Sequence, residues 1–586
     1  MNKKQKLELT WIGKDEQPVL EPRILIEDPT KSYGDPHNEN MLIHGDNLLA
    51  LKALEQKFAG KIKCIYIDPP FNTQQAFEHY DDSTEHSDWL RLIRDRVVIL
   101  HKLMTPEGTL FVHIDDNELG YLIVMLDEIF GRNNRQNIVT FKQGSATGHK
   151  AINPGCVNTS NYILIYSKSK PLWKPNKVYT GRGRDTRYGQ YIVNKMDAIE
   201  NWKIVPLTRA FSDSQRITEK AARKLVKESP ELLEAFVLDN AAMVIRTARP
   251  DYDSVSAAAR EMIDKSKGNP DVILKMERDG HSDMVFKNGE RILFYSDKLK
   301  MVDGKYVAGE PLTTLWDDIL SNNLHNEGGV TFPKGKKPEQ LIKRVFDLVT
   351  SRGDWVLDSF SGSGTTGAVA HKMGLRWIMV EMGEHCHTHI IPRLQMVCDG
   401  TDQGGVSKAV EWKGGGGFKF YDLAPSLLKQ DKHGNYVISE EYNADMMAAA
   451  MAKQEGFTYA PSQECYWKQG FSTEQDFIFT TTNHVTQAMI DLIAEEMAEG
   501  EHLLICCKKF SAGCDKRHLN IQVKKIPTML MGRCEFGKED YSSTIVNLTD
   551  EATAPVFVPQ GPKDEPSGKG TARTHGNKNP NQLELF

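Results

Sequence analysis

The stretch IYIDPPFNT, residues 65–73, closes an apolar run with an acid, two prolines and an aromatic residue. Proline fixes its own φ, lacks a backbone N–H and restrains the residue before it, so Asp68, Pro69 and Pro70 form a stiff segment. Phe71 follows directly. An acid, a free carbonyl and an aromatic ring held rigidly at a strand end predict a functional site rather than an ordinary turn.

The surrounding sequence alternates strand-like and helix-like segments. Between residues 40 and 140 the apolar runs CIYID and TLFVHI alternate with DWLRLIRDRVVILHKLM and ELGYLIVMLDEIF, whose apolar residues recur with helical period. A similar unit follows far downstream, where PEQLIKRVFDLVTSR precedes the strand-like WVLDSF and RWIMVE. Such alternation predicts an α/β fold with a parallel sheet.

Shifts in composition divide the chain into domains. Residues 141–325 lose the alternation and are richer in basic and aromatic residues, with helices predicted in EKAARKLVKESPELLEAF and SAAAREMIDKSKG. The glycine run in WKGGGGFKFYDL separates a smaller C-terminal α/β domain. We predict one sheet built from residues 1–140 and 326–405, an inserted α+β domain over 141–325, an accessory domain over 412–550 and a disordered tail over 551–586.

A second motif, VLDSFSGSGTTG, covers residues 356–367. Its glycines let the backbone approach a ligand closely, and amides at a helix N-terminus favour a negatively charged group. Glu381 ends the next strand, 17 residues after Gly364, where a Rossmann-like fold places an acid that accepts hydrogen bonds from ribose hydroxyls. This motif alone also fits a nicotinamide-dependent dehydrogenase or a tight turn without a ligand.

The two motifs together resemble amino-group DNA methyltransferases that use S-adenosylmethionine. Their D/N/S-P-P-Y/F/W signature is similar to residues 68–71, and their F-x-G-x-G loop to residues 360–364. The order of the motifs, with an insertion between them, is similar to the β class, which implies a circularly permuted Rossmann-like methyltransferase sheet with a target-recognition domain inserted. MLIHGDNLLAL and KKPEQL add a resemblance to the modification subunits of type III restriction systems. Phe71 stands where that subgroup usually has Tyr, and Ser359 where proline is common.

The resemblance implies methyl transfer to the N6 amine of an adenine flipped out of the duplex. The lone pair of this amine is conjugated with the ring, so catalysis depends on positioning and electrostatics. Asp68 and the Pro69 carbonyl would bind the two N–H groups, Pro70 would keep the segment rigid, and Phe71 would stack on the flipped base.

The cofactor residues are also implied by the resemblance. Asp358 and the glycine loop would lie near the methionine part of S-adenosylmethionine, Glu381 on the ribose and Asp46 near the adenine, with Lys337 lining the pocket. The full predicted set is Asp46, Lys337, Asp358, Phe360, Gly362, Ser363, Gly364, Thr365 and Glu381. Asp46 also fits a helix N-cap. His385 and His389 share a helix face without a further ligand, so no metal site is predicted.

A basic and aromatic stretch predicts the DNA contacts. Residues 166–203 carry nine Lys or Arg against three Asp or Glu, with Trp and Tyr interleaved. Such a mixture suits phosphate neutralisation and base contacts, although charge runs commonly face only solvent. The predicted DNA-binding residues are Lys174, Lys177, Arg182, Arg184 and Arg187.

Composition and the chain's end predict compartment and partners. Net charge is −6, nine irregularly spaced cysteines give no disulfide or zinc pattern, and neither a signal peptide nor an 18-residue apolar run is present. We expect a cytoplasmic protein that has no membrane segment and binds double-stranded DNA. Further partners are a restriction or helicase subunit and, by analogy, a second copy. The terminal QLELF, with Gln582, Leu583, Leu585 and Phe586, resembles peptides that dock on the replication sliding clamp.

Two alternatives stay open on the sequence. An N4-cytosine methyltransferase would use the same chemistry, although those enzymes more often carry Ser before the two prolines. A nicotinamide-dependent oxidoreductase would explain the glycine loop and Glu381 but would leave the DPPF segment and the basic insertion without a role.

Overall fold

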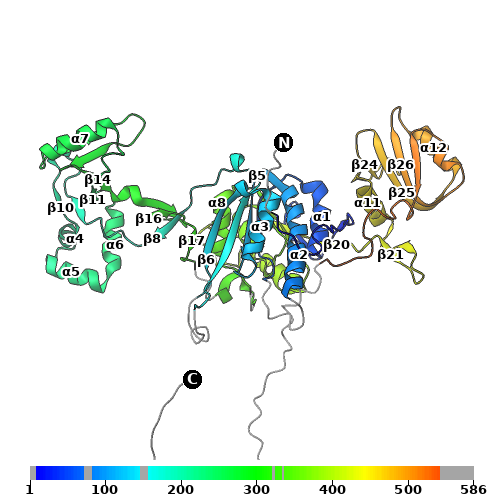
Figure 1. Ribbon diagram of the computed structural model, residues 1–586, viewed down its shortest axis with the longest axis horizontal. Helices are drawn as coiled ribbons and strands as arrows, with labels where there is room; N and C mark the ends of the chain where they lie inside the picture. The colour runs from blue at the N-terminus through cyan, green and yellow to red at the C-terminus, as the bar shows by residue number, and fades with distance from the viewer. Residues whose placement is uncertain (1–7, 72–81, 145–155, 320–323, 333–334, 542–586) are drawn as a thin grey trace, which may run out of the picture.

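The structure, a computed structural model, describes residues 8–71, 82–144, 156–319, 324–332 and 335–541. Three bodies lie side by side in Figure 1: a central α/β body, the inserted domain at the left in green, and the C-terminal domain at the right in orange. No helix in these ranges is long and apolar enough to cross a membrane.

An 11-stranded sheet runs through the central body in the order β1-β20-β3-β19-β18-β4-β5-β7-β6-β17, with β2 paired to β20. The strands from β20 to β5 are parallel, and β7 is antiparallel to both β5 and β6. The strands are β1 (Leu25–Glu27), β2 (Tyr33–Gly34), β3 (Met41–His44), β4 (Ile62–Ile67), β5 (Met104–Ile114), β6 (Arg135–Lys142), β7 (Ser160–Ser167), β17 (Leu315–Trp316), β18 (Trp355–Asp358), β19 (Arg376–Glu381) and β20 (Gly417–Leu423).

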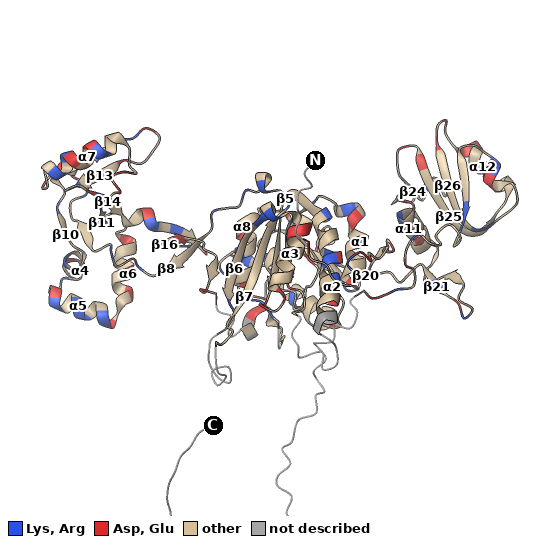
Figure 2. Ribbon diagram, in the orientation of Figure 1, with Lys and Arg blue, Asp and Glu red and all other residues tan. Residues whose placement is uncertain are grey.

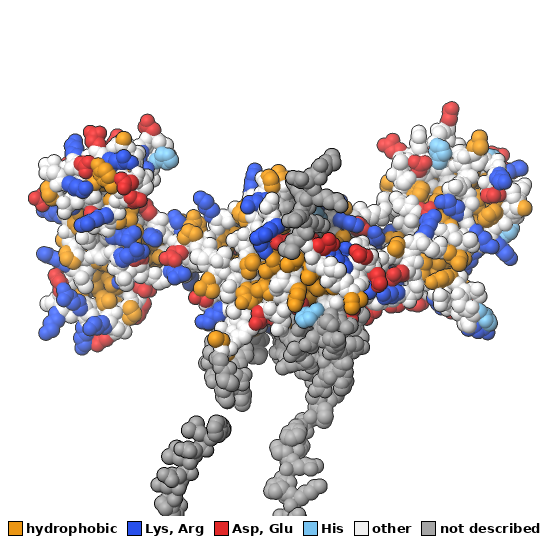
Figure 3. Space-filling model, in the orientation of Figure 1, with side chains coloured by type: hydrophobic (Ala, Val, Ile, Leu, Met, Phe, Trp, Pro, Cys, Tyr) orange, Lys and Arg blue, Asp and Glu red, His pale blue; other side chains and the backbone are white. Residues whose placement is uncertain are grey.

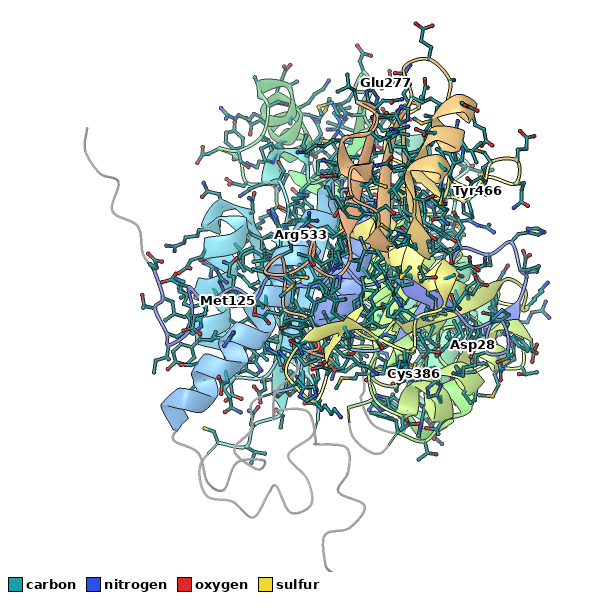
Figure 4. All side chains as sticks on the ribbon, turned by 90° about the vertical axis from the view of Figure 1, so that its right-hand side faces the viewer. Asp28, Met125, Glu277, Cys386, Tyr466 and Arg533 are labelled. Carbon is teal, nitrogen blue, oxygen red and sulfur yellow. The ribbon has the colours of Figure 1, made fainter. Side chains whose placement is uncertain are left out.

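Helices cover both faces of this sheet. One layer is α1 (Asn47–Phe58), α2 (Asp82–Leu103) and α3 (Leu119–Phe130), and the other is α8 (Glu339–Val349), α9 (Thr365–Lys372), the π-helical turn η8 (Cys386–Ile390) and α10 (Ile391–Cys398). Side chains alternate along a strand, so Ile65 and Ile67 join the first core while Cys64 and Tyr66 join the second. Figure 4 shows the layers end on, with Met125 of α3 in one and Cys386 of η8 in the other.

The two halves of the chain interleave within the sheet, as the permuted fold predicts. β18 lies between β19, from its own half, and β4, from the N-terminal half. Val356 pairs with Cys64 and Leu357 with Ile65 in parallel register. The carboxyl ends of β4 and β18 are therefore neighbours, although they lie almost 300 residues apart in sequence.

The inserted domain contains a six-stranded sheet, a three-stranded sheet and four helices. Its elements are β8 (Tyr179–Arg182), β9 (Gln190–Ile192), β10 (Ile204–Pro206), α4 (Leu207–Gln215), α5 (Glu219–Glu228), α6 (Pro230–Asp239), β11 (Val244–Ala248), α7 (Ala257–Gly268), β12 (Ile273–Met276), β13 (Met284–Lys287), β14 (Glu290–Phe294), β15 (Leu299–Val302) and β16 (Lys305–Pro311). The sheet β15-β16-β8 forms the neck that joins this domain to the central body (Figure 1). The segment EKAARKLVKESPELLEAF, where helical structure was predicted, forms two helices, because Pro230 has no N–H and Ser229 before it leaves the helical region.

The domain boundaries differ from those predicted. β6 and β7 extend the central sheet beyond residue 140, and β17 returns to it before residue 325, so the insertion is shorter than 141–325. At the other boundary β20, which follows the glycine run, pairs with β3 and does not open the accessory domain predicted from residue 412. Composition marked these limits poorly because β7 and β20 are placed in the sheet by pairing with β5 and β3, strands that are distant in sequence.

The C-terminal domain is a second, smaller α/β unit. Its strands are β21 (Leu428–Gln430), β22 (Tyr436–Ile438), β23 (Thr458–Tyr459), β24 (Gly470–Phe471), β25 (Asp476–Val485), β26 (His502–Phe510) and β27 (Ile521–Lys525), and its helices are α11 (Ala444–Gln454) and α12 (Gln487–Glu496). It contacts the central body through Lys453, whose Nζ donates to the Ala53 carbonyl at 2.7 Å. Figure 4 views the molecule from this domain, which carries Tyr466 and Arg533. The predicted tail, with the QLELF residues 582–586, lies outside the described residues.

Candidate active site

The candidate site lies where the parallel strands end. Asp68 follows β4, Asp358 ends β18 and Glu381 ends β19, and these three strands are neighbours in the sheet. Ligands of open α/β sheets bind beyond the carboxyl ends of the strands, where the order of the chain reverses. The structure thus brings the DPPF segment and the glycine loop to one edge.

The DPPF segment is held from two sides. The indole Nε1 of Trp89, on α2, donates to the Pro70 carbonyl at 2.8 Å. Lys337, just before α8, donates from Nζ to Oδ2 of Asp68 at 2.5 Å. The other oxygen, Oδ1, is buried and has no hydrogen-bond partner among the described residues. A buried acceptor without a partner is costly unless a ligand satisfies it.

Phe71 packs above a buried polar chain. Its ring centroid lies 6.1 Å from that of His113, on β5, and the two planes are tilted by 30°. His113 contacts the Tyr66 hydroxyl through Nδ1 at 2.9 Å and accepts at Nε2 from Asn161 at 3.2 Å. Burial, and then the Lys337 charge, hold the pKa of His113 well below its usual range, so the ring stays neutral. The aromatic platform therefore rests on a fixed, uncharged support.

The glycine loop has left-handed backbone at two positions. Gly362 has a φ of 50° and Gly364 a φ of 73°, a region that favours glycine. A Cβ on Gly364 would lie 3.0 Å from Ile390, whereas one on Gly362 would meet nothing within 4 Å. Open space beside Gly362, at the strand ends, is room into which a cofactor could fit.

Asp358 fixes the start of this loop. Its carboxylate accepts from the Phe360 amide at 2.9 Å and from the Thr366 hydroxyl at 2.5 Å. Burial raises the pKa of Asp358 to about 7, those two hydrogen bonds oppose the rise, and the charges of Asp68 and Glu381 add to it. A carboxyl group with so high a pKa changes charge near neutral pH.

We predict that Asp358→Asn changes how stability depends on pH. The raised pKa means that the folded protein keeps the proton which the unfolded chain loses at about pH 4. Wild-type stability should therefore fall as pH rises from there through the folded pKa of about 7, and the variant should lack this fall. Urea unfolding at pH 5 and pH 8 measures the change in the free energy of unfolding between these two pH values. The control is Asp354→Asn, at the other end of β18. Equal pH dependence in wild type and Asp358→Asn would contradict the prediction.

Glu381, which was predicted to bind the ribose, also contacts the glycine loop. Its Oε1 accepts from the Met382 and Gly383 amides at 3.0 and 3.1 Å and faces His385 Nε2 at 3.1 Å. Its Oε2 accepts from the Gly362 amide at 2.8 Å, and the described residues supply no second donor to it. A carboxylate oxygen has two lone pairs, so Oε2 retains capacity for a ligand hydroxyl, as a ribose contact requires.

Asp46 is occupied by contacts within the protein. Oδ1 caps α1 by accepting from the Leu49 amide at 3.0 Å, and Oδ2 accepts from the Tyr541 amide at 3.1 Å and from Arg96 at 3.4 Å. The N-cap interpretation of Asp46 is confirmed. Its neighbour Asn47 donates from Nδ2 to the Ser359 carbonyl at 2.7 Å, so this segment supports the cofactor loop through Asn47.

A buried charge network lies behind the loop. Glu339 accepts from Lys372 at 2.8 Å and from Arg393 at 2.8 Å, and all three side chains are inaccessible to solvent. Arg393 also donates to the Ser363 carbonyl at 3.0 Å and to the Thr365 hydroxyl at 2.8 Å. Ser363 and Thr365, predicted as cofactor ligands, are thus fixed from inside the protein.

Two of the predicted DNA-binding residues, Lys174 and Lys177, do not lie at this edge. Trp173 donates to Thr109 and Asn176 to the Leu348 carbonyl, so the exposed Lys174 and Lys177 flank contacts with the end of α8, where the parallel strands begin. This is the edge opposite Asp68. A contact of these two lysines with a ligand at Asp68 is therefore excluded by position, although their binding to DNA elsewhere stays a prediction.

Arg182, Arg184 and Arg187 lie in the inserted domain near its neck. Arg182 pairs with Glu310 at 3.0 Å, and Arg187 pairs with Asp185 at 2.7 Å, while both keep more than half of their side-chain surface exposed. Further Lys and Arg residues are distributed over this domain, as the blue segments of the ribbon in Figure 2 show, and basic side chains lie among acidic and hydrophobic ones on the face seen in Figure 3. Among them are the exposed α5 residues Lys220, Arg223, Lys224 and Lys227, which the sequence did not single out.

Several site residues were missed from the sequence. Trp89, His113, Glu339, Lys372 and Arg393 lie within segments whose pattern indicated ordinary helices and a strand. A signal exists for Lys372 and Arg393, since each interrupts an apolar run, and charged residues are almost never fully buried unless they are paired. No spacing rule links them to Glu339 or to the glycine loop.

Comparison with known proteins places this site in a family. A family model described as DNA methylase matches residues 62–392. The chain is 36% identical over 410 residues to the probable type III restriction-modification enzyme HindVI Mod subunit of Haemophilus influenzae, a match that covers 66% of this chain and 54% of the relative. It is 26% identical over 460 residues to the EcoP15I Mod subunit of Escherichia coli, which covers 65% of each. The chain therefore spans between half and two thirds of the length of these relatives.

Solved structures give weaker matches. TTHA0409 of Thermus thermophilus, complexed with S-adenosyl-L-methionine, aligns with a TM-score of 0.31 at 12% identity and covers 66% of this chain and 99% of that one. The cytosine-N4-specific PvuII DNA methyltransferase aligns with a TM-score of 0.30 at 13% identity and covers 64% and 92%.

Proposed function

The chain belongs to the DNA methylase family, and on this premise we propose that it is a site-specific DNA methyltransferase. The methyl donor is S-adenosylmethionine and the acceptor is the N6 amine of an adenine in double-stranded DNA. The observation that carries the proposal is Oδ1 of Asp68, which is buried at a strand end beside the glycine loop and has no hydrogen-bond partner in the part of the chain that the structure describes. The oxidoreductase alternative is set aside, since it gives this carboxylate no role.

The residues present fit the cofactor. Open space beside Gly362 and the spare acceptor capacity of Glu381 suit a ligand with hydroxyl groups. Asp358 and the loop from Phe360 to Thr365 would hold it. S-adenosylmethionine, when bound, would supply an electrophilic methyl group on sulphur.

The DPPF segment then performs the positioning. Oδ1 of Asp68 accepts one N–H of the target amine, and the Pro69 carbonyl, which accepts no hydrogen bond from the described residues, takes the other. Two acceptors on one nitrogen favour a pyramidal amine whose lone pair points away from both, so rate comes from orientation and electrostatics. Stacking of the base on Phe71 offsets part of an unstacking cost of about a few kcal/mol.

The reaction is tested by mass spectrometry of nucleosides. DNA from a methylation-deficient host that expresses the chain should contain N6-methyladenine, and DNA from the same host with an empty vector should not. If N4-methylcytosine is found instead, the proposed target base is wrong, but the proposed methyl transfer to an exocyclic amine stands. Absence of both, with purified protein that binds S-adenosylmethionine by calorimetry, would contradict methylation of DNA by this chain alone.

Partners are proposed on the same premise. Similarity to Mod subunits supports a restriction subunit as partner, and family analogy supports a homodimer. Docking on the sliding clamp through residues 582–586 is tested by pull-down with purified clamp before and after their deletion, and unchanged capture after deletion would refute it.

DNA contact by the insertion is tested with a triple variant. Replacing Arg182, Arg184 and Arg187 by Ala should weaken DNA binding, and the slope of log affinity against log salt should flatten by about 0.9 for each phosphate that the variant no longer neutralises. Cofactor affinity should not change. The double variant Lys174→Ala, Lys177→Ala, at the edge opposite Asp68, tests the two remaining predicted DNA contacts; if it alone weakens binding, DNA follows that edge and the assignment of the arginines is wrong.

A further inference from the structure

Lys337 contacts the one acid on which the proposed chemistry depends. Its ammonium lies 2.5 Å from Oδ2 of Asp68 and 5.3 Å from the centre of the Phe71 ring. The sequence suggested Lys337 as a lining residue of the cofactor pocket, whereas the structure directs it to Asp68. The Lys337 residue is 8% exposed, so protein groups rather than water compensate most of its charge.

The backbone that carries Lys337 is anchored. Two residues further on, the Glu339 amide donates to Glu327 at 3.0 Å, and the Glu339 carboxylate binds Arg393 and Lys372. Because Arg393 also holds the Ser363 carbonyl, one buried network fixes both the glycine loop and the start of α8. The backbone at Lys337 is therefore fixed, and its side chain extends from there to Asp68.

We propose that Lys337 is a positioning residue: its ammonium occupies Oδ2 of Asp68, turns Oδ1 toward the target amine and keeps the carboxylate ionised. The inference rests on the proposed function. An ionised carboxylate only accepts hydrogen bonds, which the amine requires, whereas a protonated one carries a competing donor. With Oδ2 occupied, a single oxygen is left to bind the amine, so the base has one orientation relative to the cofactor loop.

The ionisation of Asp68 depends on Lys337, because the other described groups near the carboxylate carry no positive charge. Burial raises the pKa of Asp68 and the Lys337 ammonium opposes the rise. Of the other groups that face it, His113 on β5 is held neutral, burial raises the pKa of Tyr66 on β4 far above neutral pH, and Asp358 on β18, whose pKa burial raises to about 7, supplies no positive charge. Lys337 is the one cation in contact with Asp68 among the described residues.

The test compares the pH dependence of Lys337→Met and Lys337→Arg with that of wild type. Single-turnover methyl transfer is measured with saturating cofactor and DNA. The acidic limb of the pH–rate profile is the range in which the rate falls because the Asp68 carboxylate is protonated. Loss of the neighbouring cation in Lys337→Met should move this limb to higher pH by about 1 to 3 units. Lys337→Arg, which keeps the charge, should retain the wild-type limb. An unmoved limb in Lys337→Met would overturn the proposal even if its rate were low.

Two further measurements separate the proposed role of Lys337 from other causes of a changed pH–rate profile. If Asp358→Asn, rather than Lys337→Met, moves the acidic limb, the titrating group is Asp358 and the proposal is wrong. A double-mutant cycle of Asp68→Asn and Lys337→Met, read from urea unfolding, requires no activity: the two changes should be non-additive, and additivity would refute the pairing. If wild type transfers no methyl group, the proposed function fails, and the cycle still judges the pair.

Discussion

Asp68→Asn should lower the single-turnover rate of methyl transfer by about 10²- to 10³-fold, the loss typical when one preorganised electrostatic contact of a transition state is removed. The amide keeps the size of the side chain but loses the charge, and its NH₂ group can replace the acceptor that faces the amine. Radiolabelled methyl transfer to a DNA duplex measures the rate. Affinity for S-adenosylmethionine, measured by calorimetry, should stay as in wild type, because the glycine loop is untouched.

The matched control is Asp116→Asn. Asp116 lies just beyond β5, the strand next to β4, is exposed, and accepts from Asn158 at 2.6 Å. It loses the same charge near the same edge of the sheet. If both variants lose activity equally, the effect is one of general charge, and the assigned role of Asp68 is refuted.

Glu339→Gln should destabilise the protein by about 3–5 kcal/mol, the cost of breaking a buried ion pair by removing one partner. Among the described residues, Lys372 then keeps one ion-pair partner, Asp402 at 2.7 Å, whereas Arg393, which is equally inaccessible to solvent, keeps none. Removal of the charge also loosens the Arg393 contact with the glycine loop, so cofactor affinity should fall. The free energy of unfolding is measured in urea by tryptophan fluorescence.

The control for this effect is Glu440→Gln. The Glu440 side chain is 91% exposed and lies 3.9 Å from Lys429, and exposed pairs contribute only about 0–1 kcal/mol. Its unfolding should match wild type. A Glu339→Gln variant as stable as Glu440→Gln would show that the buried network does not hold the fold together.

The family and the two motifs of the candidate site were accessible from the sequence because they depend on local patterns. The stiff DPPF segment and the glycine turn, each at the end of an apolar run, can be recognised from about a dozen residues. Helical periodicity likewise placed α2, α3, α7 and α8 correctly. Such features need only near neighbours in the chain, so the sequence specifies them directly.

Tertiary structure decided what spacing does not encode. The contact of Lys337 with Asp68, the contact of Asp46 with the Tyr541 amide, and the network around Glu339 join residues from distant segments. Lys174 and Lys177 look equivalent to the arginines in sequence, yet the docking of Asn176 on the end of α8 moves them to the opposite edge. The sequence by itself determined which residues could carry the chemistry, whereas packing, through long-range strand pairing and buried charge compensation, decided which of them meet.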